Sequence, residues 1–244
     1  MEREKSVYLF TTCLANSLFP DAAEAVVKVL NKAGYRVKYF EEQTCCGQMA
    51  FNAGFCNEAR AIAEHTIQSW EKIDGEIVMP SGSCTAMIRH HYLYLFADSP
   101  NWLARAQALA GRVYELTEFL VDFANVVDFR ASLDTWVAYH PSCHLLRMLG
   151  VDRQPKLLLG QVNGLDLISL EPVCCGFGGV FAEDHSTIST EMLKKKIEAI
   201  EASGASLVTG ADLSCLMHIQ GGLLKQGSEI RCVHIAEILA EGGV

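Results

Sequence analysis

The sequence has no excess of basic residues and no long apolar run. Its 244 residues include 20 lysines and arginines against 29 aspartates and glutamates, a formal net charge of −9. Such an acidic chain lacks the basic surface that nucleic-acid binding needs. No run of 18 apolar residues occurs, so no membrane span is predicted. Half of the residues are hydrophobic and 20% are charged, which excludes disorder as the dominant state and favours one or two folded domains.

A secretion signal is also missing from the sequence. Residues 2–5 are all charged, and four apolar residues, 7–10, come soon after them and are followed by two threonines. This apolar stretch is too short for the core of a signal peptide. We therefore expect a cytoplasmic protein, in which thiols stay reduced.

The sequence has no Cys-x-x-Cys motif, although it has ten cysteines in 244 residues, about 4%. This content is high for a cytosolic enzyme and low for a small disulfide-rich protein. In a reduced compartment, these cysteines fit metal ligands or redox groups. The alternative is that they are small buried hydrophobic residues. Their spacing decides between the two.

Eight of the ten cysteines form an internal repeat with an offset of 129 to 131 residues. Each copy has one cysteine, then Cys-Cys-Gly, then another cysteine. The first cysteine set is Cys13, Cys45, Cys46 and Cys84, and the second cysteine set is Cys143, Cys174, Cys175 and Cys215. Cys56 and Cys232 lie outside the repeat and are interpreted as core or incidental residues. The pattern indicates a duplicated chain.

The ends of the two copies also resemble each other. Residues 113–120 are similar to residues 233–239, at a shorter offset. The first half therefore contains extra residues, which we place at 90–102 because a turn signal lies there. We predict one cysteine-rich domain in residues 1–130 and a second in residues 131–244.

Short β-rich segments precede the cysteines, and helical patterns lie between them. The expected strands are residues 7–10, 37–40, 77–79, 135–139, 167–170 and 207–209. The expected helices include residues 22–33 and 191–202, the second with Lys194, Lys195 and Lys196 on a solvated face. This alternation predicts an α/β fold with parallel sheets. Because ligands collect beyond the carboxyl ends of parallel strands, the four thiols of each half are expected to face one inorganic centre.

Thiolates in such a cluster bind zinc or an iron–sulfur cluster. Structural zinc usually takes paired Cys-x-x-Cys motifs, which are missing here. The adjacent cysteines 45–46 and 174–175 have diverging side chains, which suits neighbouring irons better than one tetrahedral ion. Gly47 and Gly176 suit a place where the backbone comes close to the centre. These features favour a cluster and leave zinc open for one half.

Other kinds of chemistry have weaker support. Adjacent cysteines can form a redox disulfide, but this leaves four cysteines of the repeat unexplained. A nucleophilic cysteine needs a base, and His140 and His144 flank Cys143; such histidines are more often structural or donate to sulfur. The glycines of residues 175–179 lack the spacing of a dinucleotide-binding loop. No acid–base pair for substrate oxidation stands out, so no catalytic residue is assigned; the nearby Arg147, Asp184 and His185 fit a polar surface.

The duplicated pattern resembles the cysteine-rich CCG domain family, which includes the cysteine-rich subunit of heterodisulfide reductase and the iron–sulfur subunit of glycolate oxidase. Within it, the chain is most similar to the lactate utilisation protein A family. The resemblance covers nearly the whole chain. Its motifs are Thr-Cys-Leu at 12–14, Cys-Cys-Gly-Gln at 45–48, Pro-Ser-Gly-Ser-Cys-Thr at 80–85, Ser-Cys-His-Leu at 142–145, Cys-Cys-Gly-Phe-Gly-Gly at 174–179, Gly-Ala-Asp at 210–212, Cys-Leu-Met at 215–217 and His-Ile-Ala-Glu at 234–237.

The resemblance implies two Rossmann-like halves related by a pseudo-twofold axis, with the eight repeat cysteines as cluster ligands. It implies an iron–sulfur electron-transfer subunit in a system that oxidises L-lactate to pyruvate. Two partner proteins are implied, one of them a ferredoxin-type iron–sulfur protein. No nicotinamide cofactor is expected.

The sequence departs from the fuller family pattern at one position in each half. That pattern ends in Cys-x-x-Cys, and its first cysteine is replaced here by Ser81 and Asp212. With four cysteines per half, an ordinary [4Fe-4S] cluster is expected, at most one per half, or zinc in one half. Asp212 is either an oxygen ligand or a helix cap. Two other functions stay open: a cluster-dependent reductase of thiols or heterodisulfides, and a zinc-binding docking scaffold.

Overall fold

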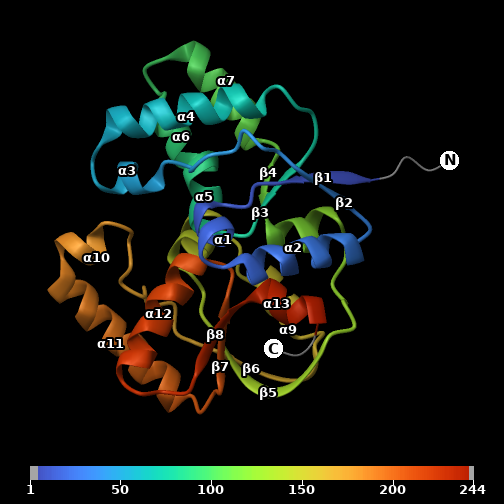
Figure 1. Cartoon of the computed structure of the whole chain (residues 1–244), viewed down its shortest axis with the longest axis vertical. Coiled ribbons are helices and arrows are strands. Elements are labelled where there is room, and N and C mark those ends of the chain that lie inside the picture. The colour runs from blue at the N-terminus through green and yellow to red at the C-terminus, as the bar shows by residue number, and fades with distance from the viewer. Residues whose placement is uncertain (1–4, 242–244) are drawn as a thin grey trace.

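Two similar parallel sheets form the framework of the protein (Figure 1). The structure is a computed structural model that describes residues 5–241. The first sheet has the strand order β2-β1-β3-β4 and the second the order β6-β5-β7-β8. The strands are β1 (Ser6–Leu9), β2 (Arg36–Tyr39), β3 (Ile77–Met79), β4 (Val113–Glu115), β5 (Ser132–Tyr139), β6 (Asn163–Ser169), β7 (Leu207–Gly210) and β8 (Arg231–His234).

Helices connect the strands in both halves. In the first half these are α1 (Cys13–Ser17), α2 (Pro20–Lys32), α3 (Gln48–Asn52), α4 (Cys56–Trp70), α5 (Gly82–Ala86), η1 (Met87–His91), α6 (Tyr92–Leu95), α7 (Pro100–Ala110), α8 (Leu116–Glu118) and η2 (Phe119–Phe123). In the second half they are η3 (His144–Met148), α9 (Arg153–Leu159), α10 (Phe181–Asp184), α11 (Ser186–Ala202), α12 (Leu213–Lys225) and α13 (Ile235–Glu241). The η elements are π-helical turns.

The predicted α/β architecture is confirmed. The strand expected at residues 77–79 coincides with β3, and the other five expected strands overlap observed ones. Every strand pair within the two sheets is parallel. Equivalent positions also share their register, since Met79 pairs with Glu115 in the first sheet and Gly210 pairs with His234 in the second. The repeat in the sequence is therefore a repeat of structure.

One central core is shared by both halves. Buried residues of β1 and α2, such as Val7 and Val26, belong to the same cluster as Val137 of β5 and Ile235 of α13. Each half also has an outer core on the other face of its sheet, formed with α4, α6 and α7 in the first half and with α11 and α12 in the second. Apolar burial, the main favourable term in folding, thus joins the halves as well as stabilising each one.

Helices of opposite halves pack together around this core. Helix α13 lies beside α2 (Figure 1), and α9 contacts α8 and η2. Lys32 of α2 donates a hydrogen bond from its ammonium group to the carbonyl oxygen of Ala240. The division into residues 1–130 and 131–244 stays a prediction, because this shared packing does not show whether either half folds alone.

A second link joins the loops at the strand ends. Ser81 and Asp212 form an antiparallel bridge between the halves, and the backbone N–H of Gly82 donates to the carbonyl oxygen of Ala211 at 3.1 Å. The Asp212 carboxylate accepts a hydrogen bond from the backbone N–H of Ser83 at 2.7 Å. The two positions that depart from the family pattern therefore meet at the junction of the halves.

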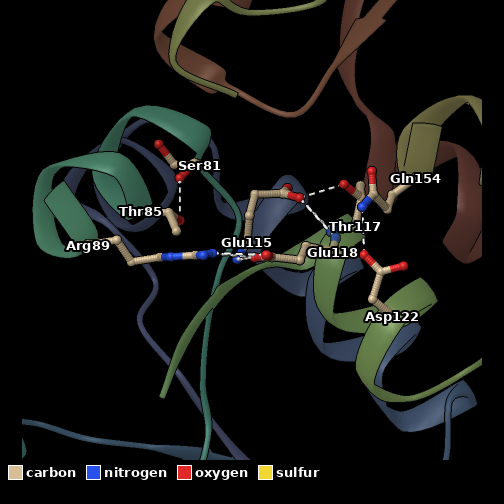
Figure 2. Close-up of polar contacts among 8 residues, drawn as sticks. All are labelled: Ser81, Thr85, Arg89, Glu115, Thr117, Glu118, Asp122 and Gln154. Carbon is tan, nitrogen blue, oxygen red and sulfur yellow. Dashed lines mark hydrogen bonds and ion pairs between the residues drawn. The ribbon is translucent and has the colours of Figure 1, made fainter. Parts of the chain in front are cut away.

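Figure 2 shows a polar network beside this junction. The fully buried Glu115 caps α8 and accepts from the backbone N–H of Thr117 at 2.7 Å and of Glu118 at 3.2 Å. Glu118 also forms an ion pair with Arg89 at 2.7 Å. Burial raises the pKa of Glu115 to about 8, so its carboxyl group is mostly neutral at pH 7.

One sequence expectation is wrong. Helix α11 has Lys194 and Lys195 on its exposed side, but Lys196 is only 1% exposed. Its ammonium group donates to the carbonyl oxygen of Glu171 at 2.9 Å. The third lysine of the run points inward because a helix turns by 100° per residue. A run of like residues therefore cannot lie entirely on one face.

The extra residues of the first half lie between β3 and β4. Four helical elements, α5, η1, α6 and α7, occupy this connection, whereas α12 alone connects β7 and β8. Among residues 5–241, no helix is both long and apolar enough to cross a membrane.

Candidate metal or cluster site

The eight repeat cysteines lie just beyond the carboxyl ends of the strands. Cys13 begins α1 after β1, Cys45 and Cys46 follow β2, and Cys84 is in the first turn of α5 after β3. The second cysteine set repeats this placement after β5, β6 and β7. Parallel strands bring their carboxyl ends to the same edge, which is why residues so distant in sequence come together.

Both cysteine sets line one cavity of about 400 Å³. The sequence predicts convergence within each half, but it does not indicate that the two sets face a common space. Cys46, Cys175 and Cys215 are buried, Cys13 is exposed, and the remaining four are half-buried. All ten cysteines are free thiols in this structure. Cys56 and Cys232 are not among the lining residues, in agreement with their place outside the repeat.

The thiols of each set are near enough to interact strongly. Hydrogen bonds from the Cys13 and Cys46 thiols lower the pKa of Cys45 to about 2, and its sulfur also accepts from the Gly47 N–H at 3.4 Å. The donors respond in the opposite direction, since the bond to Cys45 raises the pKa of Cys13. One sulfur per set is thereby favoured as a thiolate, the form that binds metals.

The second cysteine set repeats this electrostatic pattern. Hydrogen bonds from Cys143 and Cys175 lower the pKa of Cys174 to about 2. Its sulfur accepts from the Gly176 N–H at 3.4 Å, the same distance as in the first half. Backbone N–H bonds to sulfur adjust the reduction potential of iron–sulfur clusters. This hydrogen bond would therefore influence the reduction potential of a cluster bound in either half.

Gly47 and Gly176 also have a structural explanation in the packing of the loop. Both have positive φ, +85° and +93°, a region that favours glycine. A Cβ on Gly176 would lie 2.7 Å from the carbonyl oxygen of Ser189, and one on Gly47 would lie 3.2 Å from a methyl carbon of Ile62. The backbone at these glycines therefore also lies close to α4 in the first half and to α11 in the second, which leaves no room for a side chain in the cysteine loop.

Two histidines adjoin the second cysteine set. His144 lines the cavity, with Nδ1 3.7 Å from the Cys143 sulfur and Nε2 3.3 Å from the Gln48 side chain of the other half. His140 is 1% exposed, and a ring nitrogen of His140 lies within 4.8 Å of the sulfurs of Cys175 and Cys215. Burial lowers the pKa of His140 to about 4, which keeps its ring neutral.

Asp212 caps two helices. One carboxylate oxygen accepts from the Ser83 N–H of α5, and the other accepts from the Ser214 N–H at 3.2 Å and its hydroxyl at 2.6 Å. Ser81 caps α5 by accepting from the Cys84 N–H at 3.3 Å. Asp212 is absent from the lining of the cavity. Of the two interpretations made from the sequence, the helix cap fits.

The remaining polar residues singled out in the sequence lie outside the cavity. Arg147, Asp184 and His185 are exposed and none of them lines it. Arg147 donates to the carbonyl oxygen of Pro172 at 3.1 Å. This position is that of a polar surface, as expected.

The donor set fits a thiophilic metal or a cluster. Eight sulfurs line the cavity, and a ring nitrogen of the neutral His140 lies within 4.8 Å of two of them. Thiolates with imidazole are the ligands of zinc and iron–sulfur sites. The adjacent cysteines reach the cavity from different depths, because Cys45 and Cys174 are half-buried while Cys46 and Cys175 are buried. The geometry supports the binding of a metal or a cluster.

Comparison with known proteins identifies the family. The model of the cysteine-rich CCG domain matches residues 7–89 and again residues 137–220. Lactate utilization protein A of Exiguobacterium sp. is 47% identical over 240 residues, covering 97% of this chain and 98% of that protein. Lactate utilization protein A 2 of Bacillus cereus is 43% identical over 238 residues, with the same coverage.

A solved structure confirms the fold. The crystal structure of a hypothetical protein from Helicobacter pylori matches with a TM-score of 0.69 at 11% sequence identity. The match covers 97% of this chain and 48% of that longer chain. Two matches to the domain model and relatives of equal length lead to one conclusion: the chain belongs to the lactate utilization protein A family of cysteine-rich CCG domain proteins.

Proposed function

We propose that the chain is the iron–sulfur electron-transfer subunit of a complex that oxidises L-lactate to pyruvate. The names of its full-length relatives support the role in lactate utilisation. The observation that carries the electron-transfer role is the single cavity lined by both cysteine sets. Oxidising lactate to pyruvate releases two electrons and two protons. An iron–sulfur cluster, when bound, supplies a site that takes up and passes on electrons.

The residues of this chain hold and tune that group. The eight cysteines, Cys13, Cys45, Cys46, Cys84, Cys143, Cys174, Cys175 and Cys215, are proposed as its ligands. A [4Fe-4S] cluster in each half is the proposed content, with zinc in one half as the alternative. The Gly47 and Gly176 N–H groups donate to thiolate sulfur, which stabilises the more negative, reduced state.

Lactate oxidation itself is assigned to a partner. The cavity lining among residues 5–241 includes no lysine or arginine, the side chains that best pair with a carboxylate. From the family resemblance we propose that the chain acts only together with two partner proteins, one of them a ferredoxin-type iron–sulfur protein. The subunit is then an oxidoreductase component, to which no catalytic residue for lactate is assigned.

The test begins with protein purified without oxygen. Iron and acid-labile sulfide should be present, and the visible absorption of the clusters should bleach when L-lactate and the two partners are added. Glycolate is the substrate control, and the Cys56→Ser variant is the protein control, because Cys56 is an exposed cysteine outside both sets.

Two results would overturn the proposal. Colourless protein that contains zinc alone would indicate a docking scaffold. Reduction of a disulfide substrate by the chain without its partners, with no response to lactate, would indicate a thiol or heterodisulfide reductase.

A further inference from the structure

The His140 side chain is buried with no protein partner. Its backbone is fixed beside β5, since its N–H donates to the carbonyl oxygen of Thr209 in β7 at 2.8 Å. The imidazole is 1% exposed, and neither ring nitrogen has a hydrogen-bond partner. Leaving a buried polar group unpaired costs free energy, so a group bound beside it is the expected partner.

The surroundings of the ring point to a metal. One ligand atom each from His140, Cys175 and Cys215 lies within 4.8 Å of the others. Protein ligands of zinc lie 2.0–2.3 Å from the ion, and such an ion fits between atoms at these separations. Among residues 5–241, this is the one group of three or more histidine, cysteine or acidic ligands that meets this spacing.

The first half lacks this nitrogen. Phe10 occupies the equivalent place, because its N–H donates to Val78 of β3 at 3.0 Å as the N–H of His140 donates to Thr209 of β7. Phe10 stacks on Trp70 with 5.4 Å between ring centroids and belongs to an apolar core. The first half thus offers four sulfur donors, whereas the second offers four sulfurs and the unpartnered imidazole of His140.

We infer that His140 is an imidazole ligand of the centre in the second half, beside Cys175 and Cys215, so that the two halves hold chemically different centres. The inference rests on the proposed function, since it requires that the second cysteine set binds a metal or cluster. It gives the centre of the first half sulfur ligands alone. Two centres with different ligand sets at one cavity form a pair with different potentials, because the ligands and their surroundings set the potential of a cluster.

Nitrogen hyperfine spectroscopy tests the inference directly. Protein labelled with ¹⁵N-histidine is purified without oxygen, reduced and compared with unlabelled protein. A strong nitrogen coupling that changes with the label is expected in the wild type and is expected to be lost in His140→Phe. The His144→Gln variant is the matched control, because His144 also lies beside the second cysteine set, and it should keep the coupling.

The phenylalanine variant copies the residue that the first half has at this position. The wild-type measurement needs no variant, so a failure of His140→Phe to fold does not remove the test. Absence of nitrogen coupling in the wild type, or its persistence in a folded His140→Phe, would overturn the ligand assignment. Absence of iron and sulfide would instead overturn the proposed function, and the nitrogen measurement is then made on protein loaded with Co²⁺.

Discussion

The two halves of the molecule agree at the thiols and differ around them. Both place four cysteines after equivalent strands, and both donate a glycine N–H to the first sulfur of the adjacent pair at 3.4 Å. The loop that holds the sulfurs is therefore the same structure twice. A duplicated chain that keeps this loop keeps the means to bind the same kind of group in each half.

The surrounding residues have diverged in charge and polarity. At an offset of 130 residues, His140 replaces Phe10 and the buried Lys196 replaces Thr66. The environment of the second cysteine set is thus more polar and more positive. Nearby charge, hydrogen bonds and burial set the reduction potential of a cluster. Two loops with the same cysteine positions can therefore hold centres with different reduction potentials.

Exchanging one cysteine in each half is the strongest test of this comparison. Cys45→Ser and Cys174→Ser should each lose one centre, because each removes the sulfur that is most readily a thiolate in its set. Iron content should fall by about half in either variant, as expected for loss of a direct ligand. Metal analysis with spectra measures this, and Cys56→Ser should leave it unchanged. Full iron content in both serine variants would refute the ligand assignment.

The next effect concerns the residues that end β4 and β8. Glu115 and His234 occupy equivalent registers and both are buried. Burial raises the pKa of Glu115 to about 8 and lowers that of His234 to about 4. The raised pKa of Glu115 contributes to the free energy of unfolding. This contribution is fully present below the ordinary pKa of a glutamate and is lost as the pH rises through 8. The lowered pKa of His234 gives a contribution to the free energy of unfolding that is present above pH 6.5, the ordinary pKa of histidine, and is lost as the pH falls through 4.

Replacing Glu115 by glutamine should remove the alkaline part of this dependence. The free energy of unfolding of Glu115→Gln, relative to wild type, should increase by on the order of 3 kcal/mol from pH 5 to pH 8. Urea titrations at several pH values measure it. The equivalent variant His234→Gln is the control, because its group titrates on the acid side and the alkaline slope should persist. A Glu115→Gln curve parallel to the wild type would mean that the carboxyl group ionises normally.

Removing the hydrogen bond between Asp212 and Ser83, which links the halves, should have a smaller effect on the free energy of unfolding. Asp212→Ala removes the acceptor of the Ser83 N–H in the opposite half and the cap of α12. Losing a cap and leaving a buried N–H unpaired should lower the free energy of unfolding by about 2 kcal/mol. Ser81→Ala, which loses one longer cap bond of 3.3 Å, should lose about 1 kcal/mol. Equal losses in the two variants would argue against the double role of Asp212.

The sequence predicts the structure of each half better than it predicts how the two halves pack together. A short β-rich segment locates β3 at residues 77–79, and the repeat identifies all eight cysteines that line the cavity. The shared cavity and the contact of Asp212 with Ser83 depend on how the halves pack, which no local pattern encodes. Lys196 is mistaken for a surface residue because its neighbours are exposed. His140 is singled out in the sequence because it is close to Cys143. Only the structure shows that neither of its ring nitrogens has a hydrogen-bond partner.

The smallest expected effect on the free energy of unfolding concerns the residue that precedes the first cysteine of each set, because its backbone conformation differs between the halves. Thr12 has φ +71° and ψ +154°, a conformation that is adopted almost only by glycine. Ser142, its equivalent, is not among the positive-φ residues found in the part of the chain that the structure describes, and its hydroxyl accepts from the Leu145 N–H at 3.4 Å.

Glycine should therefore have opposite effects at the two sites. Thr12→Gly should raise the free energy of unfolding by about 1 kcal/mol, because relief of strain exceeds the entropy that glycine loses on folding. Ser142→Gly should lower it by about 1 kcal/mol, since it loses a hydrogen bond and gains chain entropy in the unfolded state. Urea unfolding of both variants without metal measures the pair. Destabilisation by both would mean that Thr12 is held without strain, and the two cysteine loops would then differ in their ligand environment but not in their backbone.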